Sequence, residues 1–402
     1  MINIAILGFG VVGGGVADLI TNNKKEVEEL GGDSINIKYI LDLRDFPDSP
    51  FADRVIHDYS VIANDPEIDT VIEVMGGSHP AYEFTVEALR KGKNVISSNK
   101  EVVANFGDEF MRIAEEAGVC YRFEAAVGGG IPVLSPIISC VRQNKITEVR
   151  GILNGTTNYI LTKMFTFGDS FDNALADAQA RGYAERNPDA DILGIDACRK
   201  IAILGALVSG RLVPTDKIHT EGITKVRHED VIAAEKLGMK IKLLGRCVVT
   251  PDGLYIMVAP FMLTSDSALS CVSGVYNAVE VVGEPIKSVM FYGPGAGAGP
   301  TASAVVGDLM EIMRSGRNCA IPVMVKDEGS ALSFDGFKCR TYIAMKGGCM
   351  GCVADAFGEA KAISADGEIA FLTEEMSEAE INAAVSKLES KGIEILSRIR
   401  LL

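Results

Sequence analysis

The stretch at 182–200, GYAERNPDADILGIDACRK, places four residues that could do acid–base chemistry around the start of a mostly apolar predicted helix: Glu185, Asp191, Asp196 and Lys200. An Asn-Pro pair at 187–188 precedes the apolar run and indicates a helix start, because Asn caps free amides and Pro is tolerated at the first helical position. From Ile192 to Val208 the chain is apolar almost all round, which predicts a buried helix.

Asp196 and Lys200 are four residues apart and therefore lie on one face of this predicted helix. Burial of ionised groups is costly unless they are paired or used. One interpretation is a structural ion pair. The other is a lysine that gives and takes a proton beside a carboxylate in a site of low dielectric constant, and the nucleotide-binding pattern at the N-terminus favours it.

That pattern is a GxGxxG loop placed where an apolar strand, Ile2 to Leu7, should become a helix. The glycines allow a tight turn, close approach of the backbone to a pyrophosphate, and close helix–strand packing, while the helix N-terminus supplies amides. We therefore predict dinucleotide binding by the loop residues Gly8, Phe9, Gly10, Val11, Val12 and Gly13.

The choice between NAD and NADP stays open. The next apolar strand, Ile35 to Leu41, ends at Asp42, which suits a ribose 2′-hydroxyl, whereas Arg44 suits a 2′-phosphate.

Strands and helices alternate through about residue 125, which predicts a doubly wound parallel sheet. The expected elements are strands at 71–74, 94–97 and 120–124 and helices at 82–91 and 108–117. The strand at 94–97 ends in Ser97-Ser98-Asn99-Lys100 at the carboxyl edge, where such a sheet binds its ligand. Ser97 and Lys100 are thus placed to reach cofactor or substrate, with a solvated surface lysine as the alternative for Lys100.

Three later loops have the composition of binding segments. Glu124 precedes a VGGGIP run in which carbonyls and a carboxylate suit a hard cation, although glycine runs also mark domain crossovers. The GILNGTTNYIL block contains a turn with hydroxyls and amides, including Thr156, for a small polar ligand. A glycine-rich loop at 293–299, in which we expect Gly297 to bind the cofactor, precedes a helical run from Ala302 to Met313 that we expect to return to the nucleotide domain.

From about Arg340 the pattern reads strand, helix, strand, strand, helix, strand. Asp366-Gly367 is expected to form a hairpin turn, Ser377 to Glu380 a capping box, and Gly392 a helix stop. A unit of this size serves as an oligomerisation surface or binds a regulatory amino acid, and the pattern does not separate the two.

The composition fits a soluble cytoplasmic enzyme. The chain has 402 residues, 48% of them hydrophobic, and a net charge of -15, which argues against nucleic-acid or anionic-membrane partners. We find no signal peptide pattern and no long apolar window. Nine scattered cysteines indicate reduced thiols, and the CxxC at Cys349 and Cys352 leaves a redox role open.

Taken together, these segments resemble homoserine dehydrogenases over essentially the whole chain. The family's pattern is met by Ala178, Gly182, Asn187, Pro188, Asp191, Gly194, Asp196 and Lys200. The C-terminal unit resembles an ACT domain, with Lys346-Gly347-Gly348 in place of the usual Pro-Gly turn, and Arg186-Asn187 stands where many members carry Pro-Asp.

The resemblance implies reversible hydride transfer between NAD(P)H and aspartate 4-semialdehyde, giving homoserine. It implies Lys200 as proton donor oriented by Asp196, and Lys100 as a second lysine near the substrate. It assigns Glu185 to the α-ammonium group, supported by Asp191, with Thr156 and Tyr183 also in the substrate site. Members of the family hold a structural monovalent cation such as sodium, at positions matching Glu124, Val127, Gly129 and Ile131 here.

The resemblance also implies a homodimer or a higher homo-oligomer, and a threonine effector stays open. We expect a dinucleotide domain at 1–130 plus about 295–320, a catalytic and dimerisation domain at 131–294, and an ACT-like domain at 338–402. Another NAD(P)-dependent enzyme acting on an amino-acid aldehyde, or a silent nucleotide sensor, is disfavoured, because the acidic residues and Lys200 are all present.

Overall fold

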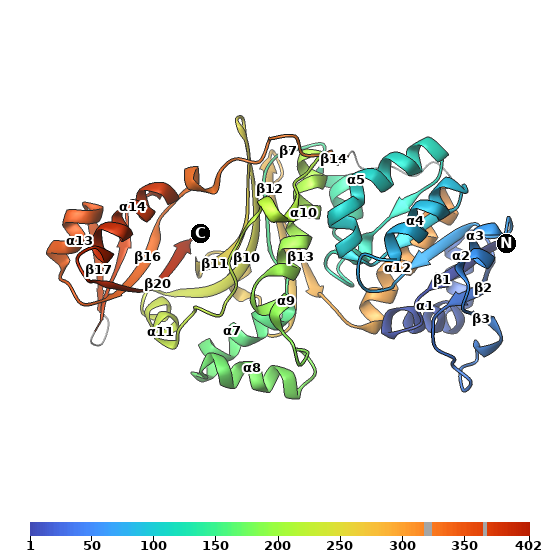
Figure 1. Ribbon diagram of the computed structural model, residues 1–402, viewed down its shortest axis with the longest axis horizontal. Helices are drawn as coiled ribbons and strands as arrows, with labels where there is room; N and C mark the ends of the chain where they lie inside the picture. Colours follow the sequence, from blue (N-terminus) through green and yellow to red (C-terminus); the bar gives the residue numbers. More distant parts are fainter. Residues whose placement is uncertain (317–323, 365–367) are drawn as a thin grey trace. The chain divides into compact units, whose positions relative to one another are not determined.

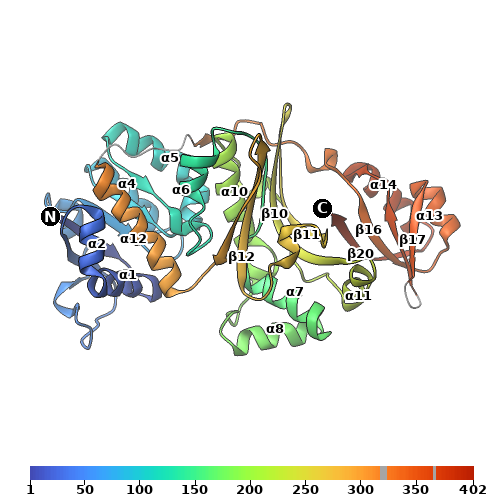
Figure 2. The same cartoon turned by 180° about the vertical axis from the view of Figure 1, so that it is seen from behind.

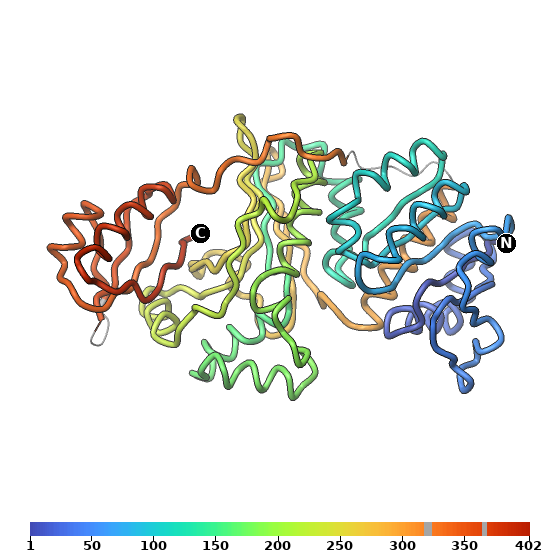
Figure 3. The backbone as a smooth tube through the Cα atoms, viewed as in Figure 1, coloured from blue at the N-terminus to red at the C-terminus, as the bar shows by residue number. Residues whose placement is uncertain are grey.

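The computed structural model describes residues 1–316, 324–364 and 368–402 (Figure 1). The chain forms two compact units, each built from three stretches of sequence: 1–145, 202–215 and 291–328 in the first, and 146–201, 216–290 and 329–402 in the second. Figure 3 traces the backbone through them.

The first unit contains a six-stranded parallel sheet with the strand order β3-β2-β1-β4-β5-β6. This order is that of dinucleotide-binding folds, so the predicted doubly wound parallel sheet is confirmed. Its strands are β1 (Ile2–Leu7), β2 (Ile35–Leu41), β3 (Val55–Ile56), β4 (Thr70–Glu73), β5 (Asn94–Ser97) and β6 (Tyr121–Arg122).

Helices cover both faces of this sheet. One group packs together on one face and the apolar core joins it to β1 and β2: α1 (Val11–Asn22), α2 (Lys24–Gly31) and α12 (Ala298–Ser315). On the other face α4 (Ala81–Arg90) packs with α5 (Lys100–Ala117) (Figures 1 and 2). The unit also has α3 (Tyr59–Asn64), α6 (Leu134–Pro136) and a small pair of strands, β8 (Arg211–Leu212) with β14 (Val325–Lys326).

Three predictions for this unit need correction. The helix predicted at 108–117 begins at Lys100, because the Asn99 side chain caps its first amides. The strand predicted at 120–124 is only Tyr121–Arg122, and a single 3-10 turn follows at Glu124–Ala126. Cys120 is disulfide-bonded, so the expectation of reduced thiols fails there.

The second unit is built on a long mixed sheet with the order β13-β12-β7-β10-β11-β20-β16-β18-β17, and β9 pairs with β11 off this path. Its first part comprises β7 (Lys145–Ile152), β10 (Met239–Thr250), β11 (Gly253–Thr264), β12 (Tyr276–Glu284) and β13 (Lys287–Pro294), with β9 (His219–Thr220) at the side. β10 pairs antiparallel with both β7 and β11.

The helices of this part are α7 (Gly155–Phe167), α8 (Phe171–Ala180), α9 (Asp189–Ile192), α10 (Ile195–Ser209) and α11 (His228–Lys236). Residues 202–209 of α10 belong to the first unit. The predicted single helix from Ile192 is divided, because Gly194 takes a left-handed conformation with φ +82 and ends α9 before α10 begins. A methyl group at Gly245 of β10 would lie 2.7 Å from Leu153 and 3.0 Å from Ile201, so α10 packs closely on the sheet.

The C-terminal elements have the predicted order β-α-β-β-α-β. They are β16 (Thr341–Lys346), α13 (Met350–Phe357), β17 (Ala360–Ser364), β18 (Ile369–Thr373), α14 (Glu378–Glu389) and β20 (Glu394–Leu401), with the small pair β15 (Lys338–Cys339) and β19 (Met376–Ser377) beside them. The capping box from Ser377 to Glu380 is confirmed, whereas the Asp366-Gly367 turn lies outside the described residues. No described helix is both long enough and apolar enough to span a membrane.

Candidate active site

A buried polar cluster lies where α7, α9 and α10 meet in the second unit. Lys200 Nζ donates to Asp196 Oδ2 and to the backbone oxygen of Leu153, each at 2.7 Å. Asn154 Nδ2 donates to Asp191 Oδ1 at 2.7 Å and to Asp196 Oδ2 at 2.9 Å. The structure thus brings together three of the four charged residues that the sequence analysis selected.

Burial makes the charges of this cluster strongly interacting. Only 7% of Lys200 and 5% of Asp196 is exposed to solvent. Burial raises the pKa of Asp191, while the hydrogen bonds from Asn154 and Thr156 oppose that rise, and Asp196 contributes a smaller upward effect by repulsion. An ammonium group held between a carboxylate and a carbonyl oxygen in such a site can move a proton to or from a neighbouring oxygen.

Asn154 is the residue that the sequence analysis undervalued. Its side-chain oxygen caps α7 by accepting from Thr157 N at 2.9 Å, while its amide nitrogen bridges the two aspartates. The sequence predicts a turn here with hydroxyls and amides for a small polar ligand, but not a bridge from Asn154 to the two aspartates. The signal for the second role was the capping position itself, since an N-cap Asn keeps an amide group free to donate in another direction.

The other predicted substrate residues surround this cluster unevenly. Thr156 is buried and its hydroxyl donates to the backbone oxygen of Tyr183 at 2.7 Å. The Tyr183 ring is half exposed and packs edge-on against Tyr159 at 5.0 Å between centroids. Glu185 lies in the exposed segment between α8 and α9, and its backbone oxygen accepts from Gln179. The structure therefore does not place the Glu185 carboxylate within the buried cluster.

The turn between Asp191 and Asp196 is held in place by backbone contacts with the segment after β9. Ile223 N donates to Ile192 O at 2.8 Å, and a methyl group at Gly222 would lie 1.9 Å from that same oxygen. A methyl group at Gly194 would lie 3.2 Å from Glu221 O. Glycine at position 222 is required for this close approach of the two backbones, and glycine at 194 is favoured both by the tight contact and by its left-handed φ of +82.

The glycine loop of the first unit has the geometry expected of a dinucleotide site. Gly8 has φ +94, and a methyl group at Gly13 would lie 1.9 Å from Gly8 O and 3.3 Å from Val74. At Gly10, by contrast, the space is open. The first turn of α1, which begins with Val11 and Val12, carries no acidic residue, so its amides present an uncompensated positive end.

Asp42 and Arg44 are bonded to each other. Asp42 Oδ2 accepts from Phe9 N at 2.8 Å, and Arg44 Nε and Nη2 donate to the two Asp42 oxygens at 3.0 and 3.1 Å. The Arg44 hydrogen bond is the main cause that lowers the pKa of Asp42 to about 2. The pair therefore presents a carboxylate that already has a partner beside an exposed guanidinium group.

Ser97 and Lys100 lie at the carboxyl edge of the sheet, as predicted. The Ser97 hydroxyl is fully buried and donates to Glu73 Oε2 at 2.6 Å, and it accepts from Asn99 N at 3.0 Å. Lys100 is the first residue of α5. Glu73 was not singled out from the sequence; burial raises its pKa to about 7, despite the hydrogen bonds that it accepts from Ser97 and Met75.

The last predicted nucleotide residue, Gly297, caps the N-terminus of α12 with φ +121. This helix packs on α1, since a methyl group at Gly15 would lie 3.1 Å from Ala298 O. The predicted return of this segment to the nucleotide domain is therefore observed within the first unit.

The Glu124 carboxylate mainly holds backbone amides. Oε1 accepts from Val133 N at 2.6 Å and from Leu134 N at 2.8 Å, while Oε2 accepts from Ser135 N at 2.7 Å. Val127, Gly129 and Ile131 lie in the same bend, where Ile131 N donates to Gly128 O. Among the described residues no group of three or more His, Cys, Asp or Glu side chains could hold a metal ion.

A Rossmann-type sheet with this glycine loop, together with a buried lysine–aspartate cluster, defines the chain as a dinucleotide-dependent oxidoreductase. A family model described as "Homoserine dehydrogenase, NAD binding domain" matches residues 8–124, and one described as "Homoserine dehydrogenase" matches residues 132–310. The chain belongs to the homoserine dehydrogenase family. It is an NAD(P)-dependent enzyme of amino-acid biosynthesis.

Curated relatives agree. Homoserine dehydrogenase from Pseudomonas aeruginosa is 41% identical over 315 residues, which cover 78% of this chain and 73% of the relative. The enzyme from Bacillus subtilis is 38% identical over 323 residues, covering 79% and 74%.

The chain is also similar to solved structures of homoserine dehydrogenases. A homoserine dehydrogenase from Thiobacillus denitrificans has a TM-score of 0.92 at 33% identity, covering 100% of this chain and 98% of that chain. A hyperthermophilic archaeal homoserine dehydrogenase mutant in complex with NADPH has a TM-score of 0.67 at 28% identity, covering 77% of this chain and 97% of its own.

Proposed function

We propose that the chain interconverts L-homoserine and L-aspartate 4-semialdehyde at the Lys200 cluster, in the synthesis of threonine and methionine. The observation that carries this proposal is the buried ammonium group of Lys200, held by Asp196 and the Leu153 carbonyl beside two further polar groups, Asn154 and Asp191. Family membership indicates the reaction, and this cluster contains the ammonium group that the reaction needs as a proton donor.

When bound, the dinucleotide supplies or accepts the hydride at the substrate's C4 carbon. Residues of the chain must transfer the proton to and from the oxygen on that carbon. During reduction of the aldehyde, Lys200 donates a proton to the oxygen as negative charge develops there, and during oxidation it accepts the hydroxyl proton. Asp196 fixes the direction of the ammonium group, because it accepts one of its protons at 2.7 Å. Lys100 acts as a second cation at the carboxyl edge of the first unit's sheet.

Recognition of an amino-acid substrate requires an anionic partner for its α-ammonium group. Asp191 is the partly buried candidate. We propose that Glu185, from its exposed segment, joins it when substrate binds, with Thr156 and Tyr183 lining the same site. A site built to pair with a charged group rejects analogues that lack it, because its own polar groups then stay unpaired.

The cofactor is NADP or NAD, held by Gly8, Phe9, Gly10, Val11, Val12 and Gly13, with Ser97, Lys100 and Gly297 nearby. The open space at Gly10 and the bare N-terminus of α1 fit a pyrophosphate. Arg44 is exposed and has only Asp42 as its partner in the described ion pairs, so it can turn to a 2′-phosphate; Asp42 then remains for a 2′-hydroxyl when NAD binds.

We also propose a structural monovalent cation, such as sodium, at the bend that contains Glu124, Val127, Gly129 and Ile131. Glu124 Oε2 accepts one amide at 2.7 Å, and a carboxylate oxygen can accept two partners, so this oxygen and nearby carbonyls form a hard donor set. Exchange of sodium for tetramethylammonium should lower the unfolding temperature, and an unchanged unfolding temperature would contradict the cation.

We propose that the C-terminal β-α-β-β-α-β unit is ACT-like and that the chain has the three-domain division given above. Threonine is then a candidate effector, and we propose that the enzyme is a cytoplasmic homodimer. The sheet edge supports dimerisation, since large apolar side chains such as Tyr276 of β12 and Met290 of β13 are exposed there. Light scattering would report the mass, and a single-chain mass would refute the dimer.

The test of the proposed reaction is the initial rate of homoserine-dependent reduction of NAD⁺ and NADP⁺. Matched controls are 1-propanol, which lacks both charged groups, and 4-hydroxybutyrate, which lacks only the α-ammonium group. Activity with homoserine and at least 100-fold lower kcat/KM with 4-hydroxybutyrate is expected. Equal rates with both would contradict recognition of the ammonium group.

A further inference from the structure

The C-terminal unit is joined to the rest of the second unit by a buried arginine, Arg400 of β20. Only 1% of Arg400 is exposed. Its Nη1 and Nη2 donate to the two carboxylate oxygens of Glu221 at 3.0 and 2.8 Å, and its Nε and Nη2 donate to those of Glu378 at 2.7 and 3.1 Å. One guanidinium group therefore holds two carboxylates from segments far apart in the sequence.

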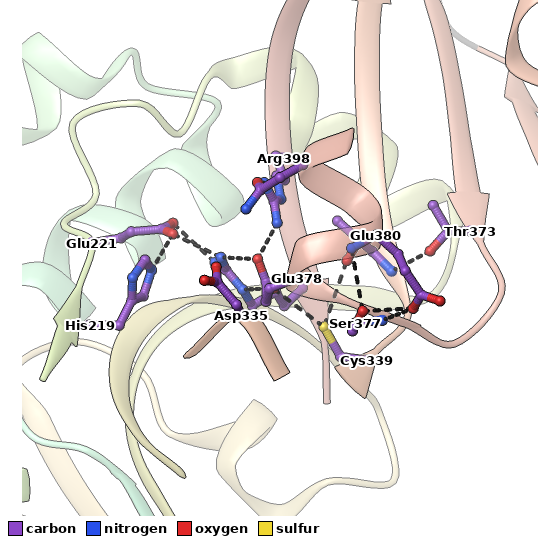
Figure 4. Close-up of polar contacts among 12 residues, drawn as sticks. His219, Glu221, Asp335, Cys339, Thr373, Ser377, Glu378, Glu380 and Arg398 are labelled. Atoms are coloured by element: carbon purple, nitrogen blue, oxygen red, sulfur yellow. Dashed lines mark hydrogen bonds and ion pairs between the residues drawn. The ribbon is translucent and has the colours of Figure 1, made fainter. Parts of the chain in front are cut away.

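The two carboxylates belong to different parts of the unit. Glu378 is the first residue of α14, and it also accepts from Arg398. Glu221 follows β9, which pairs with β11, and it also binds His219 at 2.6 Å. Figure 4 shows His219 and Glu221 on one side of this network and Glu378 with Arg398 on the other. Strand pairing makes the same connection, because Arg400 and Leu401 of β20 pair with Phe261 and Met262 of β11.

The Glu221 side leads directly to the candidate active site. Glu221 O lies 3.2 Å from the position of a methyl group on Gly194, and the next two residues make the close contacts to Ile192 O described above. Ile192 and Gly194 lie between Asp191 and Asp196 in the chain. A shift of Glu221 is therefore transmitted to the turn that carries both acids.

A hollow flanks the link on one side. A hollow of about 540 Å³ lies beside it, lined by Leu193, Thr220 and Glu221 from the catalytic part and by Val385 and Arg398 from the C-terminal elements. The polar bridge and the strand pairing connect the two parts beside this hollow, and Arg227 bonded to Glu368 and Tyr342 bonded to Asp230 connect them elsewhere.

The bridge is strongly ionic. Burial alone would raise the pKa of Glu221, but the hydrogen bonds from His219 and Arg400 lower it to about 2. Burial would likewise lower the pKa of Arg400, and the hydrogen bonds to Glu378 and Glu221 raise it instead. Both partners are therefore charged throughout the neutral pH range.

We infer that Arg400 is a positioning residue for the reaction: through Glu221 it holds the Ile192–Gly194 turn in the place that aligns Asp191, Asp196 and Lys200. This inference rests on the proposed roles of those three residues. It makes the C-terminal strand part of the catalytic framework of this chain, whether or not that unit binds an effector.

The test compares Arg400→Met with Arg398→Met. The two residues lie two positions apart on β20, both bond to Glu378, and each substitution removes one positive charge, but only Arg400 bonds to Glu221 in the described contacts. We expect kcat/KM for homoserine to fall at least tenfold in Arg400→Met and to stay within about threefold in Arg398→Met, since small misplacements of reacting groups are costly. The KM for the dinucleotide should stay within about twofold in both.

If Arg400→Met fails to fold, Glu221→Gln provides a second test, because it leaves the Arg400–Glu378 pair intact. It should lower kcat/KM for homoserine about fivefold, and adding Arg400→Met should then lower it by much less than in the wild-type background. If both arginine variants lower the unfolding temperature equally and leave kcat/KM equal, Arg400 is only structural and the inference fails. Lys200→Met is the independent check: if it keeps its activity, the proposed function fails, whatever Arg400 does.

Discussion

Gly222→Ala is the substitution that most sharply tests how the active-site turn is held. The added methyl group would lie 1.9 Å from Ile192 O and 2.5 Å from Leu193 Cα, and real contacts of this kind do not fall below 3.0 Å. The difference, 3.0 − 1.9 = 1.1 Å, is the least distance by which the Ile192 carbonyl must move. Both contacts are with backbone atoms, so no flexible side chain can move aside to relieve the clash.

Such a displacement affects both stability and catalysis. Overpacking costs about 1–3 kcal/mol of the free energy of unfolding. A shift of about 1 Å in the turn that carries Asp191 and Asp196 should lower kcat/KM for homoserine by a factor on the order of 10². The KM for the dinucleotide should be unchanged, because the glycine loop lies in the other unit.

The assay is the initial rate of homoserine oxidation together with a thermal unfolding curve. Gly307→Ala is the matched control, because it lies within α12 with open space around it and should be neutral or stabilising by up to about 1 kcal/mol. Gly222→Ala with wild-type stability and kcat/KM within threefold of wild type would refute the close approach of the two segments.

Three further predictions concern residues outside that turn. Glu73→Gln should remove a pH-dependent loss of stability, because burial raises the pKa of the Glu73 carboxyl from 4.5 to about 7 and the folded protein therefore loses stability as the pH rises through that window. In denaturant unfolding, the free energy of unfolding of the variant should gain up to about 3 kcal/mol relative to wild type by pH 8. A constant difference between the two proteins from pH 4.5 to 8 would contradict this. Arg44→Ala frees Asp42 and should raise the ratio of kcat/KM with NAD⁺ to that with NADP⁺ by on the order of tenfold, since a 2′-phosphate loses its partner; an unchanged ratio excludes Arg44 from cofactor choice. Cys349 should be alkylated by iodoacetamide before Cys140, which is also exposed, because hydrogen bonds from the Cys352 amide and thiol and from the Gly351 amide lower the pKa of the Cys349 thiol. Mass spectrometry reads the order, and faster labelling of Cys140 would show that the lowered pKa is wrong.

Much of the first unit was predictable because its signals are local. The strands at 2–7, 35–41 and 94–97 have the predicted bounds, since each is a short apolar run closed by turn residues. The glycine loop could be placed from spacing alone. The start of α5 at Lys100 was missed, because Asn99 reads equally well as a loop residue until its side chain is seen to cap the helix.

The candidate site was predictable only in part. The spacing of Asp196 and Lys200 indicates one helical face, and the structure joins them at 2.7 Å. The bridging role of Asn154 and the links from Glu221 to Arg400 depend on contacts between segments 37 to 179 residues apart, which no local pattern encodes. Gly194 was recognised as part of a motif, but its role in dividing the predicted helix follows from its left-handed conformation.

The central claim is that Lys200 moves the proton at the substrate oxygen, and Lys200→Met tests it most directly. Lys242→Met is the matched control, because Lys242 is also buried, bonded to Asn158 and to the Val272 carbonyl, and lies outside the cluster. Homoserine-dependent NAD(P)⁺ reduction should fall by a factor on the order of 10² or more in Lys200→Met, with dinucleotide binding retained and the control much less affected. Turnover within a few-fold of wild type in a folded Lys200→Met would show that the proton moves through another group.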